Sequence, residues 1–199
     1  MSKIIKFPTE KIVLENKIYA LYETSNYEKI IVYFNQLLED FDFYKKTNIY
    51  DLVLSSFFNL RLFKEVIDKG LLLLTKGYES YDLLSLLLAS YIEKRDLFFS
   101  SLLIEKSSLL TLPENKCFFD DLEKTNYTDI KSIKDSKRVI TLLLVVFQKA
   151  MLKEMLGEFK IDKEYMLYRF YDLINSINEL GYDESVISEI EKYARHIFL

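Results

Sequence analysis

The chain has 199 residues, half of them hydrophobic, with 27 basic and 31 acidic side chains and a formal net charge of −4. This composition excludes wholesale disorder, and the even mixture of the two charge signs argues against a general nucleic-acid binder. Glycine (4) and proline (2) are scarce, which disfavours a turn-rich all-β fold and favours long helices joined by tight links.

The apolar residues recur at helical spacing in successive segments of the chain. The predicted helices cover 9–24, 27–40, 48–59, 62–76, 79–94 and 96–110, followed by 136–157, 163–180 and 184–198. A polar stretch at 113–136 is too long for an ordinary connection and marks a boundary. We therefore predict an all-α chain with an N-terminal arm (1–8), three helical hairpins (9–112), a polar loop (113–136) and a C-terminal helical region (137–199). That last region is long enough for a fourth hairpin and a capping helix.

Three aromatic residues, Tyr27, Phe63 and Phe98, each open the second helix of a predicted hairpin. They are 36 and 35 residues apart, a period typical of stacked helical hairpins. A plain four-helix bundle is the alternative fold, but it requires neither the matched aromatic nor this period.

This arrangement resembles the tetratricopeptide-like repeats, in which an aromatic follows a tight turn and small or apolar residues pack the first helix of each hairpin. The residues that match those packing positions are Ala20, Leu21, Leu54, Phe57 and Ala89. The chain departs from the family where Ile30, Val66 and Ser101 replace its small residue in the second helix. The resemblance implies a right-handed superhelical stack of antiparallel hairpins, whose first helices line a concave face that receives an extended or helical peptide.

If that geometry holds, helical spacing gives the side chains on the concave face. The expected partner-binding residues are Glu15, Tyr19, Tyr22, Asp51, Ser55, Asn59, Ser90 and Glu93. The carboxylates favour a basic segment of a partner protein, and the Asn59 side chain can bond a peptide backbone through both its donor and its acceptor. The expected function is therefore a protein-protein interaction module that binds a peptide or helix of a partner.

No combination of residues indicates catalysis, a metal site or a cofactor. The only histidine, His196, has no acid, base or nucleophile beside it in the sequence, and the only cysteine, Cys117, has just a lysine neighbour. The acidic pair Asp120–Asp121 lacks the spacing and glycine of a calcium loop. We therefore expect a protein that is not an enzyme and needs no cofactor.

A second hypothesis is a self-associating structural or regulatory protein, which includes a peptide-sensing regulator without its own DNA-binding domain. An open stack of hairpins needs a polar cap, or a second copy, over its apolar end. The last predicted helix carries an apolar face that could serve either purpose, made of Val186, Ile187, Ile190, Ala194 and Ile197. The longest apolar run, 139–147, falls short of the roughly 20 residues of a membrane span. With no signal-peptide pattern and one cysteine, a cytoplasmic location is expected.

Overall fold

The computed structural model describes residues 9–116 and 135–157, together with the isolated residues 188 and 191. The predicted arm at 1–8, most of the predicted loop at 113–136 and the helices predicted at 163–180 and 184–198 lie outside these residues. So do Cys117, the Asp120–Asp121 pair and His196. The described residues form helices without strands, so the predicted all-α class is confirmed.

The chain divides into two compact units, Met1–Tyr78 and Glu79–Leu199. The boundary falls between the second and third predicted hairpins. Helices α1 to α6 belong to the first unit, and helices α7, α8, α9 and α11 belong to the second.

In the first unit, helix α1 (Thr9–Glu23) packs against α2 (Tyr27–Ile31) and against α5 (Ile49–Asn59). Helix α5 also packs against α2 and against α6 (Phe63–Thr75). Helix α5 carries more buried apolar side chains than any other described helix of this unit. They form a core because they recur on the faces that α1, α2 and α6 cover.

The helix predicted over 27–40 is interrupted in the structure. It is divided into α2 and α3 (Phe34–Glu39), and the Tyr33 N–H bonds the carbonyl of Ile30, three residues earlier, across the break. The break follows the β-branched run 30–32, whose stiff side chains lower helix propensity. A further short helix, α4 (Phe41–Tyr44), occupies part of the segment predicted as a link.

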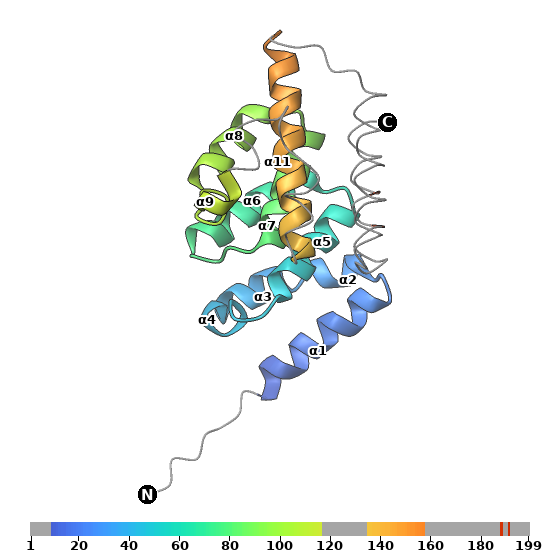
Figure 1. The fold of residues 1–199 in the computed structure, drawn as a ribbon. Helices are drawn as coiled ribbons and strands as arrows, with labels where there is room; N and C mark the ends of the chain where they lie inside the picture. The colour runs from blue at the N-terminus through green and yellow to red at the C-terminus, as the bar shows by residue number, and fades with distance from the viewer. Residues whose placement is uncertain (1–8, 117–134, 158–187, 189–190, 192–199) are drawn as a thin grey trace, which may run out of the picture. The chain divides into compact units, whose positions relative to one another are not determined.

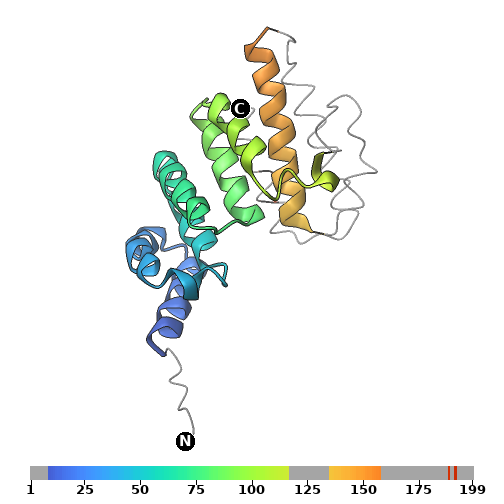
Figure 2. The same cartoon turned by 90° about the vertical axis from the view of Figure 1, so that its left-hand side faces the viewer.

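In the second unit, helix α11 (Ser136–Met155) packs against both α7 (Tyr81–Glu93) and α8 (Leu97–Lys106). The three helices lie side by side in both views (Figure 1 and Figure 2). Every side chain of α7 from Leu83 to Ile92 is buried, because the helix has neighbours on most sides. A short helix, α9 (Pro113–Lys116), begins at the start of the predicted loop.

The three hairpins α1–α2, α5–α6 and α7–α8 turn in the same way. Two positions after the end of each first helix lies a residue with positive φ, namely Ser25 (55°), Arg61 (59°) and Arg95 (55°). Each of these residues donates its N–H to the carbonyl three residues earlier, and the next N–H reaches the carbonyl five residues earlier, at 2.8–3.0 Å. This is the hydrogen-bond pattern of a Schellman helix end. The turn residues are 36 and 34 residues apart.

The side chains around the three turns also correspond. Three positions relative to the turn residue are buried in every hairpin. The residue seven positions before the turn residue is Ile18, Leu54 and Leu88 in the three hairpins, in chain order. The residue five positions after it is Ile30, Val66 and Ser100, and the residue twelve positions after it is Leu37, Leu73 and Ser107. Across the turn, Tyr22 packs edge-on against Tyr27 at 5.6 Å between ring centroids, and Phe58 against Phe63 at 5.2 Å.

This correspondence corrects one sequence assignment. Tyr27 and Phe63 each follow their turn residue by two positions, but in the third hairpin that position is Leu97, not Phe98. Leu97 is 2% exposed and begins α8, whereas Phe98 is 68% exposed. The structural counterpart of Tyr27 and Phe63 is therefore Leu97, one residue before the predicted Phe98. The sequence pattern favoured Phe98 because it is aromatic, as Tyr27 and Phe63 are, whereas Leu97 is aliphatic.

Candidate functional site

Hydrogen bonds between α1 and α5 join several of the predicted partner-binding residues in the first unit. The Tyr22 hydroxyl lies 2.8 Å from Ser55 Oγ, and Tyr19 donates its hydroxyl hydrogen to Asn48 Oδ1. Asn59 Nδ2 donates to the Ser55 carbonyl at 2.9 Å and lies 3.4 Å from Ser55 Oγ. These residues are half-buried, except Asn48, which is exposed. We call this row of polar side chains the α1–α5 face.

Glu15 extends the α1–α5 face along α1. It precedes Tyr19 by four residues and Tyr22 by seven, so the three side chains share one stripe of the helix. Glu15 is half-buried, and Glu23 at the end of the same helix is exposed. The face therefore offers carboxylates, hydroxyls and amides with aromatic rings between them.

Asp51, which the sequence also placed on the concave face, is buried. It is 6% exposed, and its Oδ2 accepts a hydrogen bond of 2.7 Å from the hydroxyl of Tyr78, which is equally buried. The carboxylate is therefore part of the interior of the first unit, where a partner chain does not reach it. Sequence spacing placed Asp51 on a first helix of a hairpin, but it could not show that the carboxylate bonds the buried Tyr78 hydroxyl.

In the third hairpin, the one-residue correction moves the corresponding positions. Relative to the turn residue, the counterparts of Glu15, Tyr19 and Tyr22 are Ser85, Ala89 and Ile92, all buried. The predicted Ser90 is 0% exposed, and among the described residues no partner lies within hydrogen-bond distance of its Oγ. Glu93 is half-buried and remains the counterpart of Asn59. The accessible polar row is therefore found in the first unit.

Asn48 belongs to the α1–α5 face although it was not among the residues predicted for the concave face. It is the N-cap of α5, but its side chain makes no capping bond. Asn48 precedes Ser55 by seven residues, two turns of a helix, so extending the same spacing would have included it.

A cavity of about 380 Å³ lies near the start of α1, between that helix and the segment that contains α3 and α4. Lys11 and Asp40 form an ion pair in its lining, and Tyr44 donates its hydroxyl to the Lys11 carbonyl at 3.2 Å. Burial, followed by the charges of Asp40 and Glu15, raises the pKa of Tyr44. The charges of Lys11 and Asp40 compensate each other, and the carboxylate of Glu10 also lines the cavity.

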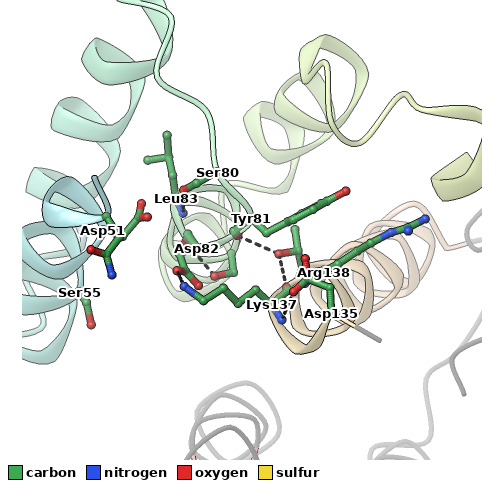
Figure 3. A network of polar contacts seen from close by, with 12 residues as sticks. Asp51, Ser55, Ser80, Tyr81, Asp82, Leu83, Asp135, Lys137 and Arg138 are labelled. Atoms are coloured by element: carbon green, nitrogen blue, oxygen red, sulfur yellow. Dashed lines mark hydrogen bonds and ion pairs between the residues drawn. The ribbon is translucent and has the colours of Figure 1, made fainter. Parts of the chain in front are cut away.

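A second polar network binds the N-terminus of α11 to α7 and α9 in the second unit (Figure 3). Lys137 pairs with Asp82, and the Thr141 hydroxyl donates to the Tyr81 carbonyl at 2.9 Å. Arg138 Nε donates to Asn115 Oδ1 at 2.7 Å. Asp135 caps α11 by accepting from the Lys137 N–H at 3.0 Å, and Ser80 caps α7 through the Leu83 N–H at 3.0 Å. These bonds hold the N-termini of α7 and α11 in place, so the network has a structural role.

Two further ionisable groups with shifted pKa values, Asp42 and Lys64, lie in surface ion pairs. A hydrogen bond from Lys45 and its charge lower the pKa of Asp42, and a hydrogen bond to Asp68 raises the pKa of Lys64. Within 9–116 and 135–157, no three histidine, cysteine or carboxylate side chains group together as metal ligands. In the same part of the chain, no helix combines the length and apolarity needed to cross a bilayer.

Comparison with protein-family profiles, with curated proteins and with solved structures found no match. The tetratricopeptide-like resemblance therefore depends on the residues and turns of the chain itself.

Proposed function

We propose that this chain is a helical-repeat protein-interaction module that binds a peptide of a partner protein without catalysis. The observation that carries the proposal is the matching turn at Ser25, Arg61 and Arg95, with buried residues at the same offsets around it. Hairpins that recur at 34–36 residues are units of stacked repeats, and such stacks are used mainly as binding surfaces. The tetratricopeptide-like resemblance and its superhelical stack are part of this proposal.

The α1–α5 face is the binding surface in this proposal. Its half-buried tyrosines offer rigid rings with a polar end, which is the side-chain chemistry favoured at protein interfaces. Asn59 and Asn48 supply donors and acceptors suited to a peptide backbone. Because Glu15 and Glu23 flank the tyrosines, the preferred peptide carries lysine or arginine. Nucleic acid, membranes and cofactors have no role in this function.

The test is selection from a displayed library of random peptides with the purified full chain as bait. We expect peptides with basic residues, whose affinity is then measured by fluorescence polarisation. Glu15→Lys should weaken binding by about tenfold, because it places like charges together, and Asn59→Ala by a similar factor. Glu28→Lys provides the matched control, since it makes the same charge reversal at an exposed position on α2. Its affinity should change by less than about twofold.

Two results would contradict this function. One is a library that yields no peptide above background at high bait concentration. The other is selected peptides that bind wild type, Glu15→Lys and Asn59→Ala equally well while circular dichroism shows all three folded.

The chain belongs, in this proposal, to the cytoplasm, because a single cysteine and the absence of a membrane-spanning helix among the described residues suit that compartment.

The alternative function is self-association. The specific observation in its favour is the exposed aromatic pair Phe98 and Phe99 on α8.

A further inference from the structure

The cavity at the start of α1, here called the α1 cavity, combines buried apolar side chains with exposed polar ones. Its volume is about 380 Å³, and its lining includes the buried side chains of Leu14 and Tyr44. Glu10 on α1 and Gln36 on α3 also line it, and both are exposed. A concave site of this size can hold one long side chain, with apolar surface for its stem and polar groups for its end.

The polar groups of the lining have acceptor atoms to spare. Among the described residues, the side chains of Glu10 and Gln36 form neither a hydrogen bond nor an ion pair with another residue. Asp40 accepts Lys11 on Oδ1, which leaves Oδ2 for a further donor. Carboxylate and amide oxygens that line one cavity suit a ligand group with several N–H donors.

The lining of the α1 cavity carries a net negative charge. Glu10 and Asp40 are acidic, and Lys11 is the only basic residue among the lining residues of the described chain. Because Lys11 pairs with Asp40, the charge of Glu10 is left uncompensated. Glu15 adds to the negative potential, since its charge also acts on Tyr44 in the same lining. A cationic ligand is therefore favoured.

Neighbouring charges do not reverse this balance. Lys17 on α1 lies over the ring of Tyr33, 5.1 Å from its centroid, and Lys45 pairs with Asp42. Lys46 is exposed and does not line the cavity. The first turn of a helix attracts anions through the helix dipole, but in α1 an acidic residue of that turn already supplies one.

We propose that the α1 cavity binds the guanidinium group of an arginine side chain, whose stem packs on Leu14 and whose N–H groups bond Glu10 and Gln36. A guanidinium carries five donors in a planar fork that matches a carboxylate. Lys11 precedes Glu15 by one helical turn, so the cavity continues the stripe of α1 that forms the α1–α5 face. The inference rests on the proposed function in one respect, namely that a bound peptide supplies the arginine.

Nuclear magnetic resonance of the full chain, labelled with a heavy nitrogen isotope, tests this site with the Gln36 side-chain amide as reporter. The probes are the Nα-acetyl amides of arginine, lysine, citrulline and glutamate. We expect the arginine probe to shift the Gln36 resonances saturably, with a Kd on the order of millimolar, because a single side chain makes all the contacts. The lysine probe should bind at least about threefold more weakly. Citrulline, which has nearly the same shape without the charge, and glutamate should cause no shift.

Glu10→Gln should weaken binding of the arginine probe at least about threefold, because it removes the uncompensated charge. Glu28→Gln is the matched control, since it makes the same change at an exposed position on α2 and should leave binding unchanged. Circular dichroism of both variants confirms that they are folded. The proposal is overturned by an arginine probe that leaves Gln36 unshifted, by lysine, citrulline or glutamate probes that bind as well as arginine, or by undiminished binding to Glu10→Gln.

These measurements keep the two proposals apart. Selected peptides that bind the α1–α5 face, together with an arginine probe that leaves Gln36 unshifted, would overturn the α1 cavity site alone. An arginine probe that binds in the cavity, together with a library that yields no peptide, would contradict the proposed function and leave the cavity site standing.

Discussion

Tyr78 donates a hydrogen bond of 2.7 Å to Asp51 Oδ2, and each side chain is only 6% exposed. The Tyr78 ring also packs edge-on against Tyr50, with centroids 5.4 Å apart. A buried carboxylate is thus satisfied by a residue 27 positions later in the chain. This bond explains why a position that helical spacing assigned to an open groove belongs to the interior.

Removing the Tyr78 hydroxyl should therefore destabilise the protein. Tyr78→Phe keeps the ring packing but takes a donor from a buried carboxylate, so the free energy of unfolding should fall by about 1–3 kcal/mol in urea denaturation. Tyr27→Phe is the matched control, because the Tyr27 hydroxyl lies 3.5 Å from Ser25 Oγ in an exposed location. Its effect should stay within about 0.5 kcal/mol. An unchanged stability of Tyr78→Phe would show that the carboxylate does not depend on this bond.

Substitutions at two residues with positive φ should change the free energy of unfolding in opposite directions. Arg61 has φ of 59°, a conformation that a side chain with Cβ adopts at a cost, so Arg61→Gly should raise the free energy of unfolding by about 0.5–1 kcal/mol. Gly77 ends α6 with φ of 82° and has open space around an added Cβ. Gly77→Ala should therefore lower stability by about 1 kcal/mol through backbone strain alone. Two changes of the same sign would contradict this account of the turns.

Ser90 carries a buried hydroxyl without a hydrogen-bond partner among the described residues. Ser90→Ala removes that polar group and improves helix propensity, so we expect thermal or urea denaturation to show a gain of about 1 kcal/mol. The same variant should bind any selected peptide as wild type does, because Ser90 is inaccessible. A loss of stability would contradict this expectation and would mean that the Ser90 hydroxyl makes a stabilising hydrogen bond.

Gln148 connects α11 to α8 from a fully buried position. Its Nε2 donates to the Leu97 carbonyl at 3.0 Å and to Ser101 Oγ at 2.8 Å. Gln148→Ala should lower the free energy of unfolding by about 2–3 kcal/mol, since it removes both bonds and leaves a void. Lys153→Ala, at an exposed position on the same helix, should change it by less than about 0.5 kcal/mol. Equal effects of the two substitutions would refute a specific role for Gln148.

Alkaline pH should destabilise the fold through Tyr50. Burial, followed by the charges of Tyr44 and Asp40, raises the pKa of Tyr50, whose hydroxyl donates to the Leu37 carbonyl at 2.8 Å. The unfolded tyrosine loses its proton near its ordinary pKa of about 10, whereas the folded one retains it to higher pH. The stabilisation is therefore complete below about pH 10 and is lost as pH rises above that value.

Urea denaturation between about pH 8 and about pH 11 measures this loss. Tyr50→Phe should be less stable than wild type at neutral pH, because it lacks the bond to Leu37, but its stability should fall less steeply at alkaline pH. Identical alkaline slopes for the two proteins would contradict the assignment to Tyr50.

Local signals in the sequence determined most helix positions in the described part of the chain. Apolar spacing predicted 48–59 and 62–76, close to α5 (Ile49–Asn59) and α6 (Phe63–Thr75), and Gly77 with positive φ follows the end of α6. These features were predictable because periodicity and helix-terminating residues act over a few neighbouring residues. The hairpin turns at Ser25, Arg61 and Arg95 were harder to locate, because none is a glycine.

Tertiary structure alone decided which polar positions are accessible. The sequence could place Glu15, Tyr22, Asp51 and Ser90 on first helices, but not show that Tyr78 encloses Asp51 while Tyr22 and Ser55 remain half-buried. The shift from Phe98 to Leu97 likewise required the backbone conformation of Arg95. Exposure depends on contacts between residues far apart in the chain, and spacing along one helix does not contain that information.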